Sequence, residues 1–403
     1  MSEVSTDETF FNGVVADIAE INPKTEISLA EEERVSFLPM QNTSESGNII
    51  SLQERAFREV SKGYTRFAEN DILVAKITPC FENGKGGYAE GLLNGTSFGS
   101  TEFHIVRAIP GRADSRFLHH LTRSERFRRS GEGSMTGSAG QKRVPADFIK
   151  EFPIFIPPLP EQKKIAEILS GIDIAITKNK TKVQKLDALQ FSLTEEFTQD
   201  LQESFEASAL EEHAEIRTGV AKNSNNDGDM IEMPYMRVAN VQDGYLDLSE
   251  VKAISIDRGR AERYLLRKGD VLINEGGDLD KVGRGVIWNE EVRQCLHQNH
   301  VFAVRCSEQL MPEFLSLCLK SSHSKNYFLG CAKQTTNLAS INSTQLKSFP
   351  IPVPPLDEQK KFVEHIKSAR DLSLAIATEM SALEAMKKAV SSDLLSGRKR
   401  VSV

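Results

Sequence analysis

Two long stretches of the chain place apolar residues alternately four and three positions apart, the spacing of the buried seam of a coiled coil. The first seam is Ile165, Leu169, Ile172, Ile176, Asn179, Val183, Leu186, Gln190, Leu193 and Phe197. Adding 197 gives Phe362, Ile366, Ala369, Ser373, Ile376, Met380, Leu383, Lys387, Val390 and Leu394. Each seam predicts a helix of about 40 residues, roughly 60 Å long. The matched register favours pairing of the two helices over two unrelated amphipathic helices.

Polar residues interrupt both seams. Asn179 and Gln190 lie in the first, where Ile376 and Lys387 stand in the second. A buried polar residue at such a position fixes the register or meets a partner subunit, and an exposed edge of the seam is the alternative.

A proline-rich segment precedes each helix and is also duplicated. Residues 152–164 read FPIFIPPLPEQKK and residues 349–361 read FPIPVPPLDEQKK, so ten of thirteen positions are identical. Proline excludes helix interiors and central strands, which predicts an extended arm in each copy. The acidic residue of each Glu-Gln-Lys-Lys sequence is placed favourably at the start of a helix.

Alternating apolar runs predict strands before each arm, at 71–77, 103–107 and 301–305, and short helices at 115–129 and 312–328. We therefore expect two mixed α/β globules related by a pseudo-twofold repeat, with the two long helices forming an antiparallel coiled coil. The expected boundaries are 1–158 for the first globule and arm, 159–205 for its helix, 206–355 for the second globule and arm, and 356–403 for its helix. Residues 1–35 match the second copy only through Ala19-Glu20-Ile21 against Ala214-Glu215-Ile216.

The amino-acid composition narrows the class of protein. The 403 residues are 39% hydrophobic and 27% charged, with a net charge of −7, which is typical of a soluble protein of two or three domains. No apolar run approaches the roughly 20 residues of a membrane span, and the acidic N-terminus does not resemble a secretory signal. Five cysteines without a Cys-x-x-Cys pair indicate reduced thiols, so we expect a cytoplasmic protein.

Two similar globules on rigid helices suit the gripping of two places on one extended object, such as duplex DNA. The sequence also resembles the specificity subunit of type I restriction-modification systems. The resemblance rests on the doubled arm and helix, on Asp71-Ile72-Leu73 and Gly269-Asp270-Val271-Leu272, and on the sequence YMRVANV at 235–241.

The resemblance implies two tandem target recognition domains, each reading one half of a bipartite asymmetric site, with the helices setting the gap. It also implies a subunit without catalysis or cofactor of its own, whose partners are double-stranded DNA, two modification (methyltransferase) subunits and restriction (endonuclease) subunits. Partner docking is expected on the helical regions, at Glu161, Gln162, Lys163, Asn179, Glu358, Gln359 and Lys360.

Candidate DNA contacts are residues whose side chains donate to base edges or phosphates and that flank predicted strand ends or lie in polar loops. In the first copy they are Lys76, Thr78, Ser100, Thr101, His104, Ser138, Gln141, Lys142 and Arg143. In the second copy they are Arg217, Thr218, Lys222, Asn274, Arg284, Asn299, His300, Lys333, Gln334, Thr335 and Asn337. The alternative for each is a surface or packing role. Arg123, Arg126, Arg128 and Arg129 are phosphate contacts or a solvated helix face.

Signals for other chemistry are weak. Cys295, His297, His300 and Cys306 have ligand chemistry for zinc, but they fall on a strand-like stretch without a counterpart in the first copy. The chain contains no P-loop, no Gly-x-Gly-x-x-Gly and no Asn-Pro-Pro-Tyr tetrapeptide. A self-contained nuclease or methyltransferase and a purely structural bridging protein remain the alternatives to a DNA reader.

Overall fold

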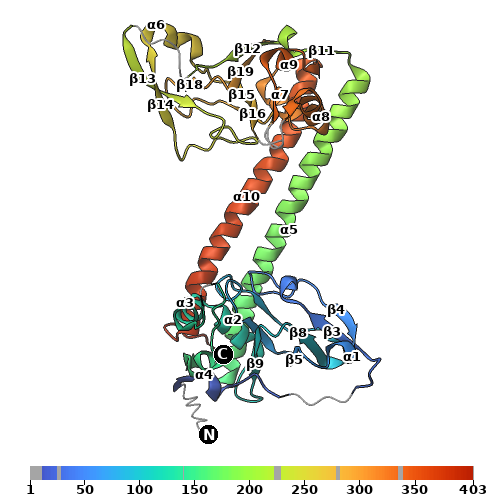
Figure 1. Cartoon of the computed structure of the whole chain (residues 1–403), viewed down its shortest axis with the longest axis vertical. Coiled ribbons are helices and arrows are strands. Elements are labelled where there is room, and N and C mark those ends of the chain that lie inside the picture. Colours follow the sequence, from blue (N-terminus) through green and yellow to red (C-terminus); the bar gives the residue numbers. More distant parts are fainter. Residues whose placement is uncertain are drawn as a thin grey trace, which may run out of the picture. The chain divides into compact units, whose positions relative to one another are not determined.

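The computed structural model describes residues 11–24, 29–138, 140–221, 228–277, 282–334 and 339–402. The chain divides into two compact units. Unit 1 combines Met1–Asn179 with Thr378–Val403, and unit 2 is Lys180–Ala377. Each unit holds one globule together with portions of two long helices, α5 (Leu159–Ser204) and α10 (Leu356–Leu395) (Figure 1).

The described part of unit 1 contains two four-stranded sheets, a two-stranded ribbon and short helices. The first sheet has the order β2 (Ala19–Ile21), β9 (Phe103–Ala108), β6 (Ile72–Ala75), β7 (Gly86–Tyr88). The second has the order β4 (Gln53–Ala56), β3 (Arg34–Leu38), β8 (Thr96–Gly99), β5 (Thr65–Ala68), and the ribbon pairs β1 (Phe11–Val14) with β10 (Pro153–Ile156). The helices are η1 (Val15–Asp17), η2 (Met40–Asn42), α1 (Phe57–Val60), η3 (Leu93–Gly95), α2 (Ser115–Arg123), α3 (Glu125–Ser134) and α4 (Ala146–Glu151).

Unit 2 repeats this plan within its described residues. Its main sheet has the order β12 (Ala214–Thr218), β19 (Val301–Cys306), β15 (Val271–Asn274), β17 (Gly285–Ile287). A second sheet has the order β14 (Lys252–Asp257), β13 (Met230–Met236), β18 (Leu296–His297). A third has the order β16 (Gly276–Gly277), β21 (Ala339–Ser340), β20 (Lys333–Gln334). A two-stranded ribbon pairs β11 (Ala207–Ala209) with β22 (Pro350–Pro352). The helices are η4 (Leu210–Glu212), α6 (Arg258–Ala261), η5 (Glu262–Tyr264), α7 (Pro312–Cys318), α8 (Ser322–Cys331) and α9 (Ser343–Lys347).

The strand registers show that the two units share one frame. Ile72 pairs with Val106 and Ala75 with Phe103 in unit 1, whereas Val271 pairs with Val304 and Asn274 with Val301 in unit 2. A buried aspartate at the start of the central strand binds an arginine of the neighbouring strand in both. Arg107 donates to both oxygens of Asp71 at 2.7 and 2.6 Å, and Arg305 donates to both oxygens of Asp270 at 2.8 Å.

The repeat begins earlier than the sequence match suggested. β1 pairs with the proline arm of unit 1, as β11 does with the arm of unit 2. A short helix follows in each case, and its third residue, Asp17 or Glu212, accepts a hydrogen bond from the backbone of Val14 or Ala209. Different side chains thus build the same turn, which explains why the sequence match was limited to three residues.

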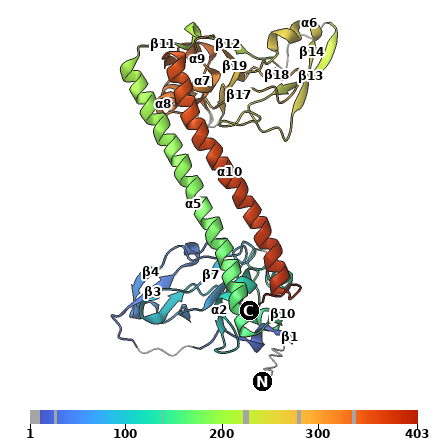
Figure 2. The same ribbon diagram turned by 180° about the vertical axis from the view of Figure 1, so that it is seen from behind.

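The two long helices pack antiparallel within each unit (Figures 1 and 2). In unit 1, Leu394 and Leu395 share a core with Ile165 and Leu169. In unit 2, the ring of Phe197 stacks on that of Phe362 with 3.8 Å between centroids. All twenty predicted seam positions are buried or half-buried. The predicted fold class, duplicated α/β globules with an antiparallel helix pair, is confirmed.

Both short helices expected as continuous segments are broken. Ser124 is extended between α2 and α3, and its hydroxyl accepts from the backbone N–H of Phe127 at 3.3 Å. Ser321 does the same for α8, accepting from Ser324 at 3.3 Å. Serine satisfies the exposed amides at the start of a helix, so it favours a new helix over continuation of the old one. Among the described helices, none has both the length and the apolar character that a bilayer crossing requires.

Candidate nucleic-acid interface

Most of the candidate DNA contacts gather at one end of the main sheet in each unit, where the central strand ends and its neighbour begins. In unit 1, Lys76 donates its backbone N–H to Glu102 at 2.9 Å and accepts from Val144 at 2.9 Å. Thr78 donates its N–H to the carbonyl of Lys142 at 3.0 Å. We call this region the strand-end edge; in unit 1 it comprises Lys76, Thr78, Ser100–Glu102 and Gln141–Arg143.

An ion pair organises the strand-end edge of unit 1. Arg143 donates through Nε and Nη2 to the carboxylate of Glu102, with distances of 3.0 and 2.9 Å to its two oxygens. This hydrogen bonding lowers the pKa of Glu102 below its usual value. Gln141 and Lys142 are exposed beside the pair, and so are Ser138 and Thr101. The edge therefore presents donors around one carboxylate.

The side chains of two candidates of unit 1, His104 and Thr78, are hydrogen-bonded within the protein. His104 is buried, and its ring nitrogens lie 3.1 Å from Asn22 Nδ2 and 2.8 Å from the carbonyl oxygen of Val144. Burial lowers the pKa of His104, so the imidazole is neutral at pH 7. Thr78 Oγ1 donates to Glu82 at 2.8 Å. His104 is therefore removed from the candidate set, because both of its nitrogens already have partners inside the protein.

The strand-end edge of unit 2 has the same backbone frame. Glu275 donates its N–H to His300 at 3.0 Å, as Lys76 does to Glu102. The His300 imidazole is hydrogen-bonded to the Glu275 carboxylate. Together with Lys333 these two residues line a cavity of about 520 Å³. In unit 2 the edge comprises Glu275–Gly277, Gln298–His300, Lys333 and Ser340.

The remaining candidates of unit 2 are divided. Thr218 is exposed and pairs with Phe302 beside the edge, and Asn299, within the edge, donates its N–H to Val220 at 3.0 Å. Arg284 also lies there, because its carbonyl accepts from Asn274 at 2.9 Å. By contrast, Asn274 is buried and donates to the carbonyl of Val241 at 2.9 Å. Arg217 donates to the carbonyl of Arg263.

Several candidates cannot be placed. Lys222, Thr335 and Asn337 lie outside the described residues, and for Gln334 only the backbone is described, paired with Ala339. Sequence reasoning also missed residues at the same edges: Lys85, Glu102 and Glu275. Lys85 accepts from Ala75 at 3.1 Å, as Arg284 does from Asn274. The repeat offset of 199 would have found Lys85 from Arg284.

Two arginines of the run on α2 and α3, Arg123 and Arg128, are turned inward. Arg128 is mostly buried and donates to the carbonyls of Phe81 and Gly84 at 3.1 and 3.3 Å, and burial lowers its pKa to about 10. Arg123 pairs with Asp173 at 3.2 Å, and Arg126 lies 4.9 Å from the ring centre of Phe152. Arg123 and Arg128 are therefore used inside the protein, whereas Arg126 and Arg129 stay exposed and Arg129 pairs with Glu125, so part of this run is a solvated helix face.

The expected partner-docking residues are also divided. Gln162 and Gln359 are fully buried and tie the proline arm to the loop before α2 or α7. The Gln162 amide donates to Arg112 and Pro157 at 3.0 and 2.9 Å, and that of Gln359 to Gln309 and Pro354 at 2.8 Å. These two residues therefore cannot dock a partner. Only Lys163, Glu358 and Lys360 of this set are exposed.

Glu161 and Asn179 are buried as well. Arg400 donates to both oxygens of Glu161, with distances of 2.8 and 2.6 Å, and Val401 adds its N–H at 3.1 Å. The C-terminal tail thereby covers the start of α5, whereas the equivalent Glu358 is exposed. Asn179 lies in the helix seam.

The residues with zinc-ligand chemistry have other partners. His297 Nδ1 donates to the carbonyl of Val301 at 2.6 Å, and burial lowers its pKa to about 4. Burial raises the pKa of the Cys295 thiol to about 12. Across the described ranges, no group of three or more histidine, cysteine, aspartate or glutamate side chains is placed to hold a metal ion.

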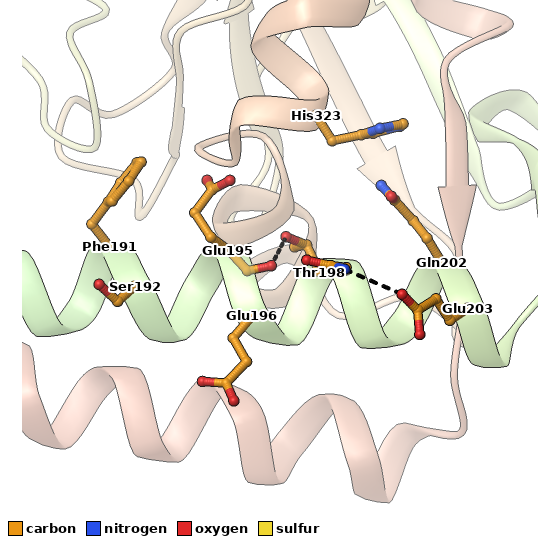
Figure 3. Close-up of a pocket in the computed structure, with 9 residues that line it drawn as sticks. Phe191, Ser192, Glu195, Glu196, Thr198, Gln202, Glu203 and His323 are labelled. Atoms are coloured by element: carbon orange, nitrogen blue, oxygen red, sulfur yellow. Dashed lines mark hydrogen bonds between the residues drawn. The ribbon is translucent and has the colours of Figure 1, made fainter.

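A further hollow of about 780 Å³ lies in unit 2, along α5 (Figure 3). Glu195, Glu196 and Glu203 line it, with Phe191 at one end and His323 of α8 opposite. Glu195 accepts the backbone N–H of Ser322 at 2.7 Å. Three carboxylates repel phosphate, so this hollow does not suit nucleic acid.

Comparison with known proteins agrees with this geometry. Residues 9–187 and 202–383 match the family described as type I restriction modification DNA specificity domain, once for each repeat. The EcoAI specificity subunit of Escherichia coli is 46% identical over 150 residues, covering 37% of this chain and 25% of that protein. The EcoKI specificity subunit of E. coli K12 is 25% identical over 271 residues, covering 63% and 58%. The chain thus spans only part of the length of these relatives.

Solved structures extend the likeness to the whole fold. The HsdS subunit from Thermoanaerobacter tengcongensis is 17% identical, with a TM-score of 0.51 and coverage of 99% and 100%. The type I S subunit from M. genitalium is 14% identical, with a TM-score of 0.53 and coverage of 98% of each chain. At such identities the likeness concerns the fold alone. The family match over both repeats, together with the duplicated arm, helix and sheet frame, shows that this chain belongs to the type I restriction-modification specificity subunit family.

Proposed function

We propose that this chain reads DNA for a type I restriction-modification complex, with each globule recognising one half of a bipartite, asymmetric duplex site. The strand-end edge of each unit meets the DNA in this proposal. The chain is not itself an enzyme and needs no cofactor. Two modification subunits supply methyl transfer and restriction subunits supply cleavage, in the cytoplasm.

One observation carries the proposal: the two units share a backbone frame but differ in the side chains at its end. Lys76 and Glu102 of unit 1 occupy the places that Glu275 and His300 occupy in unit 2, with equivalent backbone hydrogen bonds of 2.9 and 3.0 Å. Base edges are distinguished by the pattern of donors and acceptors that face them. Two frames with different edge chemistry suit a site whose halves differ in sequence.

The helices offer a surface for the modification subunits. In unit 2, large apolar side chains remain about half exposed on α5 and α10 although the seam is filled: Leu189, Phe191, Leu372 and Leu374. Such side chains on a protein surface mark interaction sites when they lie close together. We expect Phe191→Glu to weaken association with a modification subunit in size-exclusion chromatography, whereas Lys182→Glu, on the same helix, serves as the charge control.

The central test is selection of bound duplexes from a randomised pool by the chain assembled with its modification subunits. The proposal expects two short conserved blocks separated by a gap of fixed length. It also expects binding that weakens steeply with salt, because phosphate contacts release counterions. A pool without conserved blocks would favour a structural bridging protein instead. Titration of the isolated chain with S-adenosylmethionine tests whether the chain is itself a methyltransferase. Binding of S-adenosylmethionine to the isolated chain would contradict the proposal.

A further inference from the structure

Each strand-end edge carries a carboxylate where a phosphate-binding surface would be expected to carry only donors. Glu102 and Glu275 are 25% and 26% exposed, respectively, so both are held at the surface rather than in the core. Each accepts a hydrogen bond from a recognition candidate of its own unit, Arg143 or His300. The two carboxylates stand at different positions of the shared frame: Glu102 corresponds to His300, and Glu275 to Lys76.

Each edge thus keeps a surface carboxylate hydrogen-bonded to a donor side chain, although the donor is Arg143 of another segment in unit 1 and His300 of the neighbouring strand in unit 2. Lys76 and Glu275 leave the central strand, and Glu102 and His300 enter its neighbour. In unit 1 the carboxylate is on the entering segment, and in unit 2 it is on the leaving segment. A carboxylate that merely stabilised one turn would be expected at the same position of the frame in both units.

The pair in unit 1 has the geometry of a competitor for DNA. Arg143 uses Nε and Nη2 for the two oxygens of Glu102, which is the same fork that would bind O6 and N7 of guanine or the oxygens of a phosphate. Non-specific binding is supplied almost entirely by phosphates. A carboxylate already seated on the arginine both occupies the donor and repels an arriving phosphate.

We propose that Glu102 and Glu275 are specificity-determining counter-charges, which hold the recognition side chains in the DNA-free protein and suppress binding to non-specific DNA. The inference rests on the proposed function and adds a mechanism to it. At the correct half-site, base contacts replace the carboxylate as partner of the recognition side chain. At other sequences the intramolecular pair persists, and the phosphate contact is lost. Specificity thus arises partly from a repulsive element built into the protein.

The test compares Glu102→Gln with the unaltered chain, each assembled with the modification subunits, on two 30-bp duplexes: the selected site and a scrambled sequence. Glutamine keeps the shape and one acceptor oxygen, so the local fold stays. We expect affinity for the scrambled duplex to rise roughly three- to tenfold and its salt dependence to steepen by about one phosphate contact, with a smaller change for the selected site. Glu54→Gln is the matched control, because it removes one carboxylate paired with Arg34 on another sheet of the same unit.

A double-mutant cycle identifies the route. If Glu102 acts by holding Arg143, Glu102→Gln has no effect on scrambled-duplex affinity in an Arg143→Gln background. Glu275→Gln with His300→Gln repeats the cycle in unit 2. Unchanged affinity for the scrambled duplex, or equal losses on both duplexes, would overturn the inference while leaving the proposed function standing. Absence of any preference in the unaltered complex would instead overturn the proposed function.

Discussion

The glutamine of each Glu-Gln-Lys-Lys sequence holds three elements together through one side chain. Gln359 donates to Gln309 and Pro354 and accepts from the N–H of Met311 at 2.9 Å, and Gln162 makes the equivalent set with Arg112, Pro157 and Asp114. A buried amide with every partner inside the protein joins the arm, the long helix and the loop before the next helix. The identity of this residue in both copies follows from that geometry.

Replacing Gln359 by alanine should destabilise unit 2 by about 3 kcal/mol, because the fully buried amide and its hydrogen bonds to three backbone groups are lost. The single tryptophan of the chain, Trp288, is buried in unit 2, so its fluorescence reports the unfolding of this unit in urea. Gln199→Ala is the control, since Gln199 is exposed on α5 in the same unit and should change stability by no more than about 0.5 kcal/mol. Equal losses of unfolding free energy in Gln359→Ala and Gln199→Ala would refute the role of Gln359 in joining the arm, the helix and the loop.

Acid should destabilise unit 2 through His297. Its folded pKa is lowered to about 4, whereas an unfolded histidine has a pKa of about 6.5. The unfolded state therefore binds more protons between these values, and stability falls as pH decreases through this range. Between pH 6.5 and 5 the loss reaches about 2 kcal/mol. His297→Asn, which keeps a donor for Val301, should show a shallower pH dependence in urea denaturation followed by Trp288. Parallel pH profiles would count against this role.

At the scale of elements, the C-terminal tail belongs to the globule of unit 1. Gly397 adopts a left-handed conformation with φ of 73°, and an added Cβ would lie 2.7 Å from the ring of Phe155. Beyond it, Arg400 covers the same ring and pairs with Glu161. The tail follows α10 in the sequence but completes the arm and the start of α5 in space.

Arg400→Ala should therefore destabilise unit 1 by about 2 kcal/mol, because it leaves the Glu161 carboxylate, only 4% exposed, without its guanidinium partner. Hydrogen exchange of the β6 amides measures the effect within that unit. Arg398→Ala provides a comparison, since Arg398 pairs with Asp393 at the surface and should cost less than about 1 kcal/mol. If the β6 amides are equally protected from hydrogen exchange in Arg400→Ala and Arg398→Ala, the tail does not support the core of unit 1.

The elements differ in how far the sequence predicts them. The seams and arms could be predicted because their periodicity and prolines act locally, and the duplication supplied a second observation of each. The breaks at Ser124 and Ser321 could not, because a serine inside a helical pattern either continues the helix or caps a new one, and the choice depends on tertiary packing. The inward turn of Arg128 was likewise hidden, since a charge run does not show which side of a helix meets the core.

For the whole molecule, the repeat predicted the fold better than it predicted the site. The strand-end edges were approached through Lys76 and His300, which flank strand ends in the sequence, and through Arg143, which ends a polar loop. His104 and Asn274 flank the same ends but face inward, because side chains alternate across a strand and one position separates the core from the surface. Glu102 and Glu275 were missed because carboxylates were not expected among DNA contacts.

Exchange of the first globule, residues 1–158, for that of another family member should alter one half of the target and leave the other half unchanged. The reason is that each unit has its own cores and its own strand-end edge. Methylation mapping in cells that carry the partner subunits gives both halves in one measurement. Exchange of residues 206–355 is the reciprocal experiment, and a change in both halves after either exchange would contradict modular reading.

The division of unit 1 between the two ends of the chain also sets an order of events at the ribosome. Ile165 and Leu169 emerge long before Leu394, Leu395 and Arg400, which complete their surroundings. At 5–20 residues per second, the 224 residues after Asn179 take roughly 10–45 s to synthesise. During that interval Ile165 and Leu169 lack the cover of Leu394 and Leu395, while Lys180–Ala377 can close as a continuous segment. Termination of synthesis before Thr378 would therefore harm the globule encoded first.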